Sequence, residues 1–323
     1  MVILIHGLNG HFLDSWRHAD APSDACWPHW LSEDSGCDVY LLEYDASLSR
    51  WQHQAMPLPD QGDQVASLFS VHPALAERQL VLIGHSMGGL VIKTLITQSM
   101  QKDDPRHQAM VRRICGVVFI ATPHQGAELA NLAQALGKLL RPNPQVSNLQ
   151  LHDAHLRQLN HTFRAEHARL GFAVQVFAES RDLEWQTKGP WLPWLTQQVR
   201  VRVVDPSSSD PSLPGVTAVP LAHDHISISK PINRNEHLHH AVCAFLGEIP
   251  SLTAQLAAPA ALVPVAAPVP TQPPARLSGG NDKKLNPVEK EVYGRDAIVA
   301  QVLDFLRGDA NTLTVAAAKE VSG

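Results

Sequence analysis

Short runs of apolar residues alternate, over residues 1–250, with longer segments in which apolar residues recur every three or four positions. The short runs have the length of β-strands. Most of them are continuous rather than alternating with polar residues, which is typical of parallel strands covered on both faces. This succession predicts an α/β fold with a mostly parallel sheet flanked by helices. We expect strands at residues 2–5, 38–44, 80–84, 114–121, 172–179 and 199–204.

Three segments between these runs have helical periodicity. Residues 90–100 directly follow a glycine-rich turn, and residues 127–140 place their leucines along one face. Residues 147–171 open on Ser147 as an N-cap candidate and end at Gly171. The last two segments lie between the fourth and fifth expected strands, where we expect an insertion that forms a lid or a substrate wall.

The composition changes abruptly after residue 250. Residues 251–287 are rich in Ala and Pro, and proline at this density prevents both helix and sheet. Residues 288–323 have the pattern of a short helix and a strand, but so few residues cannot bury a core of their own. We therefore expect an α/β domain over residues 1–250, a disordered Pro/Ala-rich linker over 251–287 and a short tail.

Charge and cysteine usage narrow the class of protein. The 26 basic and 31 acidic residues give a net charge of −5 without a long run of either sign, which argues against nucleic-acid binding and against a polybasic membrane anchor. The four cysteines are scattered without CxxC spacing, so we expect reduced thiols rather than disulfides or a zinc site. With neither an export signal nor a run of 18 apolar residues, the sequence predicts a cytoplasmic protein without an integral membrane segment.

A Gly-x-Ser-x-Gly pattern lies between the strand at 80–84 and the helix at 90–100. Gly84 and Gly88 leave room for a sharp turn that would expose the Ser86 hydroxyl above the sheet. The N–H of Met87, at the start of the helix, would then point towards a developing oxyanion. The pattern favours Ser86 as a nucleophile; the alternative is a tight turn in which the serine only caps the helix.

A second oxyanion donor is expected in the loop after the first strand. Residues 6–10, His-Gly-Leu-Asn-Gly, contain glycines that would let a backbone N–H face Ser86, and Leu8 is the leading candidate. The alternative is an ordinary turn at the end of a strand.

Chain order selects the candidate base among 18 histidines. In folds with such a turn the nucleophile is followed by the acid and then by the histidine. This order favours His225, with His223 in reserve, whereas His237, His239 and His240 are expected on a late surface helix. The histidine spacing matches no standard metal motif, so we expect neither a metal nor a cofactor.

Two strand ends offer an acid. The fifth expected strand ends near Glu179 and Asp182, and the sixth near Asp205. If the loop at residues 6–10 follows the third strand of a full hydrolase sheet, Glu179 follows the seventh, the strand that normally carries the acid. Glu179 leads, and Asp205 is the alternative if the strand count is off by one.

Six stretches occur in the order seen in the serine-active-site-containing and GPI-inositol-deacylase-like lipases of the α/β-hydrolase superfamily: "HGLNGHFLDSW", "YLLEYDA", "LIGHSMGGLVIK", "FIATPHQGAELA", "FAES" and "LAHDHISISKP". The resemblance covers residues 1 to about 247. It implies an esterase or lipase acting on acyl esters, with Ser86 as the family nucleophile, His225 as the family histidine and Glu179 as the family acid. The chain departs from larger relatives because it begins directly at "MVILIHG" and lacks the transmembrane helices of the membrane-bound deacylases.

The tail resembles a different group. "VYGRDAIVAQVLDFL" followed by "TLTVAAAKEVSG" is similar to the entry into a NACHT or NB-ARC (STAND) signalling ATPase. Residues 318–323 would fit the first six positions of a P-loop, but the Lys and Ser/Thr that contact phosphate and Mg²⁺ do not follow, so nucleotide binding is not expected. The resemblance implies a piece of a larger protein with an N-terminal effector domain; the alternative is a disordered end.

Two functions are compatible with these residues. The leading one is hydrolysis of a carboxylic ester, with a lipid as substrate if the apolar face of 129–140 and the tryptophans Trp185, Trp191 and Trp194 contact a membrane surface peripherally. These apolar residues would otherwise belong to the core or to a packed loop. The second function is that of a non-catalytic, hydrolase-like effector domain of a STAND-type signalling or defence protein.

Overall fold

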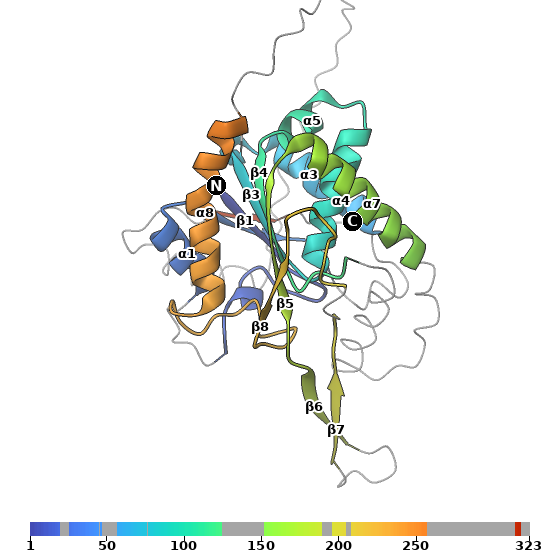
Figure 1. Cartoon of the computed structure of the whole chain (residues 1–323), viewed down its shortest axis with the longest axis vertical. Helices are drawn as coiled ribbons and strands as arrows, with labels where there is room; N and C mark the ends of the chain where they lie inside the picture. Colours follow the sequence, from blue (N-terminus) through green and yellow to red (C-terminus); the bar gives the residue numbers. More distant parts are fainter. Residues whose placement is uncertain are drawn as a thin grey trace, which may run out of the picture.

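A computed structural model describes residues 1–19, 26–44, 46, 57–75, 77–124, 152–188, 196–204, 208–256 and 314–317. A central sheet runs through the molecule with helices on both faces (Figure 1). Its strand order is β8-β5-β4-β3-β1-β2-β9, and every neighbouring pair is parallel. The expected α/β class with a parallel sheet is confirmed. The strands are β1 (Val2–Ile5), β2 (Val39–Glu43), β3 (Leu80–His85), β4 (Ile114–Ile120), β5 (Ala173–Glu179), β8 (Ala218–Leu221) and β9 (Thr314–Ala317).

Two helical layers cover the sheet. Helices α1 and α8 contact each other and lie on one face, whereas α3, α4, α5 and α7 form the layer on the other face (Figure 1). Short 3-10 turns lie at η1 and η2. The bounds are α1 (Trp27–Ser35), α3 (Leu58–Val71), α4 (Met87–Gln101), α5 (Pro105–Val111), α7 (His152–Leu170), α8 (His237–Leu256), η1 (Asp14–Trp16) and η2 (Pro73–Leu75).

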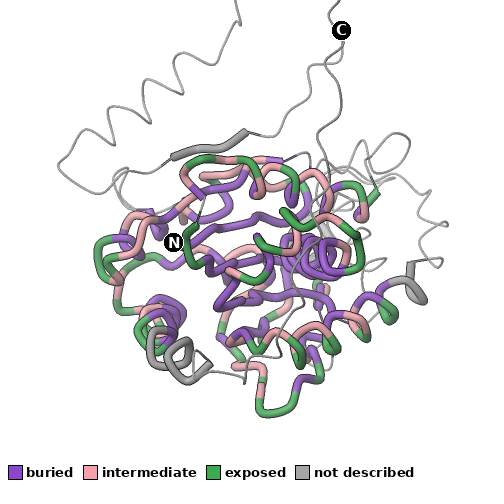
Figure 2. The backbone as a smooth tube through the Cα atoms, turned by 90° about the horizontal axis from the view of Figure 1, so that it is seen from above, coloured by how far each residue is buried: buried purple, intermediate pink, exposed green. Residues whose placement is uncertain are grey.

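Two hydrophobic cores lie against the central sheet, one on each face. In β1, Ile3 and Ile5 belong to the core under α3 and α4, while Val2 and Leu4 belong to the core under α1 and α8. All four are at most 2% exposed, and Figure 2 shows the buried backbone concentrated in the middle of the molecule. Because both faces are covered, the strand reads as one continuous apolar run.

The sixth strand differs from the expectation. Residues 199–204 were expected to join the central sheet, but β7 (Thr196–Val201) pairs antiparallel with β6 (Leu183–Lys188) in a hairpin that projects from the body (Figure 1). The strand that pairs with β5 is β8 instead. Its burial is only partial, as expected of a sheet edge, and its four residues include Pro220, which weakens the sequence signal of a strand.

Some of the expected helices are present, and others lie outside the described residues. Residues 90–100 lie in α4, and α7 ends immediately before Gly171, whose φ of 72° suits a glycine after a helix. The expected helix over 127–140 and Ser147 lie outside the described residues. Helix α8 ends at Leu256 and thus extends past residue 250, where the linker was expected to begin.

The strand expected in the tail is present as β9. It pairs with β2 in parallel, from Tyr40 opposite Thr314 to Glu43 opposite Ala317, so this part of the tail belongs to the central sheet. Residues 318–323, which resemble the start of a P-loop, lie outside the described residues, as does most of the linker. Within the part of the chain that is described, no helix is both long and apolar enough to cross a membrane.

Candidate active site

Ser86 lies in the turn between β3 and α4 with φ 54° and ψ −122°. A serine rarely adopts positive φ, and such strained residues are concentrated at functional sites. Its N–H donates to the carbonyl oxygen of Ile120 at 2.9 Å, which fixes the turn to β4. A Cβ on Gly88 would lie 2.1 Å from the carbonyl oxygen of Ile5, so only glycine allows α4 to start this close to β1.

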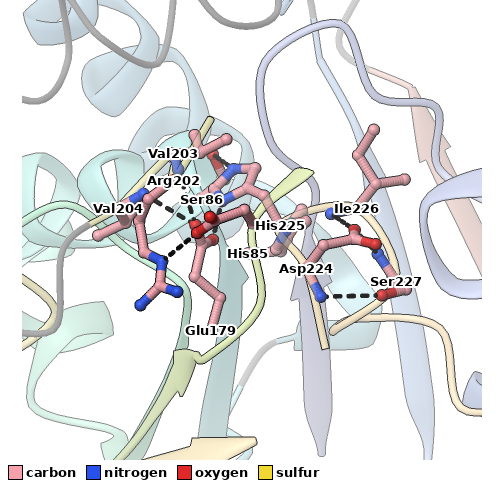
Figure 3. Close-up of polar contacts among 11 residues, drawn as sticks. His85, Ser86, Glu179, Arg202, Val203, Val204, Asp224, His225, Ile226 and Ser227 are labelled. Atoms are coloured by element: carbon pink, nitrogen blue, oxygen red, sulfur yellow. Dashed lines mark hydrogen bonds and ion pairs between the residues drawn. The ribbon is translucent and has the colours of Figure 1, made fainter. Parts of the chain in front are cut away.

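Ser86, His225 and Glu179 form a continuous line of hydrogen bonds (Figure 3). The Oγ of Ser86 is 2.8 Å from Nε2 of His225, and Nδ1 of the same ring is 2.6 Å from Oε2 of Glu179. All three side chains are buried. With a carboxylate at Nδ1, the ring carries its proton there, and Nε2 is left to accept the serine proton.

Glu179 is fixed on its other oxygen by the base of the hairpin. Its Oε1 accepts the backbone N–H groups of Val203 and Val204, both at 2.9 Å. Glu179 ends β5, and the two valines follow β7 after Arg202. The carboxylate therefore has partners on both oxygens, which is what a buried charge requires.

The other candidates for base and acid are engaged elsewhere or lie outside the described residues. Nε2 of His223 is 3.3 Å from the carboxylate of Glu236. Asp182 accepts a hydrogen bond from Nε of Arg202 at 2.8 Å, an ion pair that closes the base of the hairpin. Asp205 is not among the described residues.

The loop that carries His225 is stabilised by its own aspartate. Oδ1 of Asp224 accepts the N–H groups of Ile226 at 2.8 Å and Ser227 at 3.0 Å, and the Ser227 hydroxyl accepts the N–H of Asp224 at 3.2 Å. Figure 3 shows Asp224 turned towards these residues and away from Glu179. Asp224 shapes the turn and is not part of the line of hydrogen bonds.

His85, the residue before Ser86, contributes a contact that the sequence pattern did not reveal. Its Nε2 donates to the carbonyl oxygen of His225 at 2.8 Å, and the two ring centroids are 5.2 Å apart. Burial, followed by the proximity of His225, holds the pKa of His85 well below its usual value, so the ring is neutral. The middle position of Gly-x-Ser carries no signal of its own, and only the fold places it against the histidine loop.

The loop after β1 lies against the turn. A Cβ on Gly7 would be 2.8 Å from Cβ of Ser86, which shows how closely this loop approaches the serine. The loop is supported by Tyr44, whose hydroxyl donates to the carbonyl oxygen of His6 at 2.6 Å and whose ring stacks on that histidine at 4.6 Å. Leu8 is 7% exposed and lines the same pocket as Ser86.

A pocket of about 270 Å³ opens at Ser86 and His225. Met87, the first residue of α4, is fully buried, and its N–H is one of the four that have no acceptor within the helix. Most of the lining is polar or glycine. The lining residues are Gly7, Leu8, Asn9, Gly10, His11, Asp14, Ser15, His85, Ser86, His225, Ile226, Ser229 and Lys230.

The late histidines lie on α8, as expected, but one of them is not on the surface. His239 is 2% exposed, and its Nε2 is 2.8 Å from Oδ2 of Asp34, because this side of α8 packs against α1. His237 and His240 are exposed. Among the described side chains, no three histidines, cysteines or carboxylates are arranged to hold a metal ion.

Residues 48–162 match the family model described as a PGAP1-like alpha/beta domain. This range contains Ser86 but neither Glu179 nor His225. Among curated proteins the chain is similar to Protein SERAC1 of Homo sapiens, with 27% identity over 267 residues, and to Protein SERAC1 of Mus musculus, with 26% over 266 residues. In both cases the similarity covers 76% of this chain and 38% of the relative, so the chain spans well under half of these proteins.

Two solved structures illustrate the structural likeness. Phospholipase PlaB from Legionella pneumophila in complex with thio-NAD is 13% identical over 79% of this chain and 61% of its own, with a TM-score of 0.48. The lipase BlEst2 of Bacillus licheniformis in its mature form is 18% identical over 78% of this chain and 91% of its own, with a TM-score of 0.44. The fold follows from the chain itself: a parallel sheet of this strand order, with Ser86 between β3 and α4 and a histidine loop after β8, is the α/β-hydrolase fold expected from the sequence.

Proposed function

We propose that the protein is a serine hydrolase of carboxylic esters, with Ser86 as nucleophile, His225 as general base and Glu179 as the acid that orients the histidine. The observation that carries the proposal is the line of hydrogen bonds from Glu179 through His225 to Ser86, at 2.6 and 2.8 Å. A nucleophilic serine needs a base within hydrogen-bond reach and a third group that holds the base.

The reaction follows from these positions. Oγ of Ser86 attacks the ester carbonyl while Nε2 of His225 takes the hydroxyl proton. The N–H groups of Leu8 and Met87 stabilise the oxyanion that forms. The C–O bond to the alcohol then breaks, and His225 returns its proton to the leaving oxygen. A water molecule, deprotonated by the same histidine, hydrolyses the acyl-enzyme and releases the carboxylic acid.

Several features support this assignment over a turn that has no chemical role. Ser86 adopts a strained backbone conformation although it needs none to cap a helix, and its side chain makes no capping hydrogen bond. Glu179 is buried with both oxygens hydrogen-bonded, which keeps a carboxylate at the ring without requiring solvent. Residues 48–162, which contain the turn, match the model of a PGAP1-like alpha/beta domain, and this match supports the proposal.

The test is labelling with a fluorophosphonate probe together with hydrolysis of p-nitrophenyl esters from acetate to octanoate. Wild type should be labelled and should hydrolyse at least one ester, and Ser86→Ala should do neither. Ser67→Ala, at an exposed serine on α3, is the matched control and should behave as wild type. An unlabelled wild type that cleaves no ester of any chain length would contradict the proposal. The chain-length profile would also test the lipid contact expected of residues 129–140 and of the tryptophans.

A further inference from the structure

Lys230 enters the same pocket as Ser86 from a fixed position in the histidine loop. Its backbone N–H donates to the carbonyl oxygen of Ser227 at 2.9 Å. The neighbouring Ser229 hydroxyl donates to the carbonyl oxygen of Ser15 at 2.9 Å, which attaches the loop to η1. The backbone of Lys230 is therefore held in place, unlike the backbone of a lysine on a mobile surface loop.

The ammonium group of Lys230 has no carboxylate within 4.0 Å among the described residues. Burial lowers the pKa of Lys230, and the carboxylates of Asp14 and Asp224 oppose that shift from a distance. Oδ1 of Asp14 lies 3.9 Å from the guanidinium of Arg17, and its Oδ2 lies 3.4 Å from Nδ1 of His11. The pocket thus contains a partly desolvated positive charge whose cost no direct ion pair offsets.

The exposed surface of the pocket is more apolar than polar, although most of its lining residues are polar or glycine. Leu8 and Ile226 are the larger apolar residues there, and Lys230 is the one lysine or arginine among the described lining residues. A negatively charged group of a substrate would supply the hydrogen-bonded partner that this lysine lacks.

We propose that the pocket binds an ester whose alcohol part carries a negative charge, and that Lys230 is the residue that recognises this charge. The inference rests on the proposed ester hydrolysis and specifies its substrate class. Because His225 must return a proton to the leaving alcohol, the alcohol must lie beside that ring, and Lys230 lines the same space. A phosphate or a carboxylate would satisfy the lysine.

The experiment compares three octanoyl esters that share one acyl chain: those of glycerol, glycerol 3-phosphate and glyceric acid. Released octanoate is measured for wild type, Lys230→Gln, Lys230→Arg and the control Lys102→Gln, whose lysine is paired with Asp63 on the surface. Wild type should favour at least one anionic ester over the neutral ester about tenfold in kcat/KM, as expected of a hydrogen bond to a charged group. The preference should disappear in Lys230→Gln and persist in Lys230→Arg and Lys102→Gln.

The two anionic esters distinguish a phosphate site from a carboxylate site. Raising NaCl from 50 to 500 mM should reduce the wild-type preference, and this measurement remains available if Lys230→Gln fails to fold. Hydrolysis of the neutral ester without preference for either anionic ester would overturn the inference while leaving the proposed function intact. A preference that survives Lys230→Gln would also overturn it. Absence of both ester hydrolysis and fluorophosphonate labelling would reject the proposed function itself.

Discussion

His225 and His124 are buried to the same extent, 1% exposed each, and both follow a strand of the central sheet. Both ring nitrogens of His225 have partners, Ser86 and Glu179. Neither ring nitrogen of His124 has a hydrogen-bond partner in the described part of the chain, and its ring packs edge-on against Phe119 at 4.8 Å. Burial alone therefore does not distinguish the two histidines; the partners on both ring nitrogens set His225, the proposed general base, apart from His124.

The surroundings of the two rings differ in charge as well. His124 lies near Lys93, whose Nζ donates to Oδ1 of Asn160 at 2.6 Å and lies over the rings of Phe119 and Phe163. Burial lowers the pKa of both Lys93 and His124, and the lysine lowers that of the histidine further. His225 instead faces a carboxylate. The surroundings of His225 stabilise a positive charge on its ring, whereas the surroundings of His124 disfavour one.

The difference between the two histidines is tested most directly by making the same substitution at both positions. His225→Gln should reduce kcat/KM for a p-nitrophenyl ester by at least about 10⁴-fold, because the serine loses its base. His124→Gln should retain most of the activity, since no reacting group contacts that ring. Equal losses in the two variants, with both proteins folded by circular dichroism, would show that His225 has no special role.

The second largest loss of activity is expected when Glu179, the proposed acid, is substituted. Glu179→Ala should lower kcat/KM about 10³-fold to 10⁴-fold, because it removes the carboxylate from His225 and leaves the N–H groups of Val203 and Val204 unpaired. Asp205→Ala should be close to wild type. Glu179→Gln, which keeps the shape but not the charge, separates the electrostatic loss from misfolding. A larger loss in Asp205→Ala than in Glu179→Ala would contradict the assignment.

A smaller effect is expected at His85. His85→Phe keeps a ring but removes the donor to the carbonyl oxygen of His225, so kcat should fall about tenfold to 100-fold with little change in KM. His85→Gln can still donate and should recover part of the rate. His161→Phe, at an exposed histidine on α7, is the control. If His85→Gln is no better than His85→Phe, the hydrogen bond does not position His225.

The smallest effect concerns stability. His124→Leu removes two buried nitrogens without partners and should raise the free energy of unfolding by about 1 kcal/mol in urea denaturation at pH 8. His124 has a lowered folded-state pKa, so the unfolded chain binds more protons and stability falls as the pH drops below about 6.5. Between pH 6.5 and 5, the free energy of unfolding should therefore fall less in His124→Leu than in wild type. His161→Leu should change neither quantity, and a destabilised His124→Leu would mean that the ring has a partner in the folded protein.

The sequence predicted the central strands and the helix after Ser86 because apolar continuity and periodicity are local signals. It misplaced the sixth strand because the valine-rich pattern of residues 199–204 is typical of a strand but does not say which strand it pairs with, and residues 199–201 pair with β6 in a hairpin. β8, half-exposed at the sheet edge, has no comparable signal. It also placed His239 on a surface helix, since periodicity gives a helix but not the partner that covers it.

The sequence by itself determined the turn at Ser86: glycines on both sides of a serine, between a strand and a helix, specify this local geometry through sterics. It also restricted the acid and the base to a few residues through chain order. Only the tertiary structure decided which carboxylate reaches His225, that two backbone N–H groups hold Glu179, and that His85 and Lys230 face the same pocket. These contacts join residues 24 to 140 positions apart, and such separations close only when the sheet assembles.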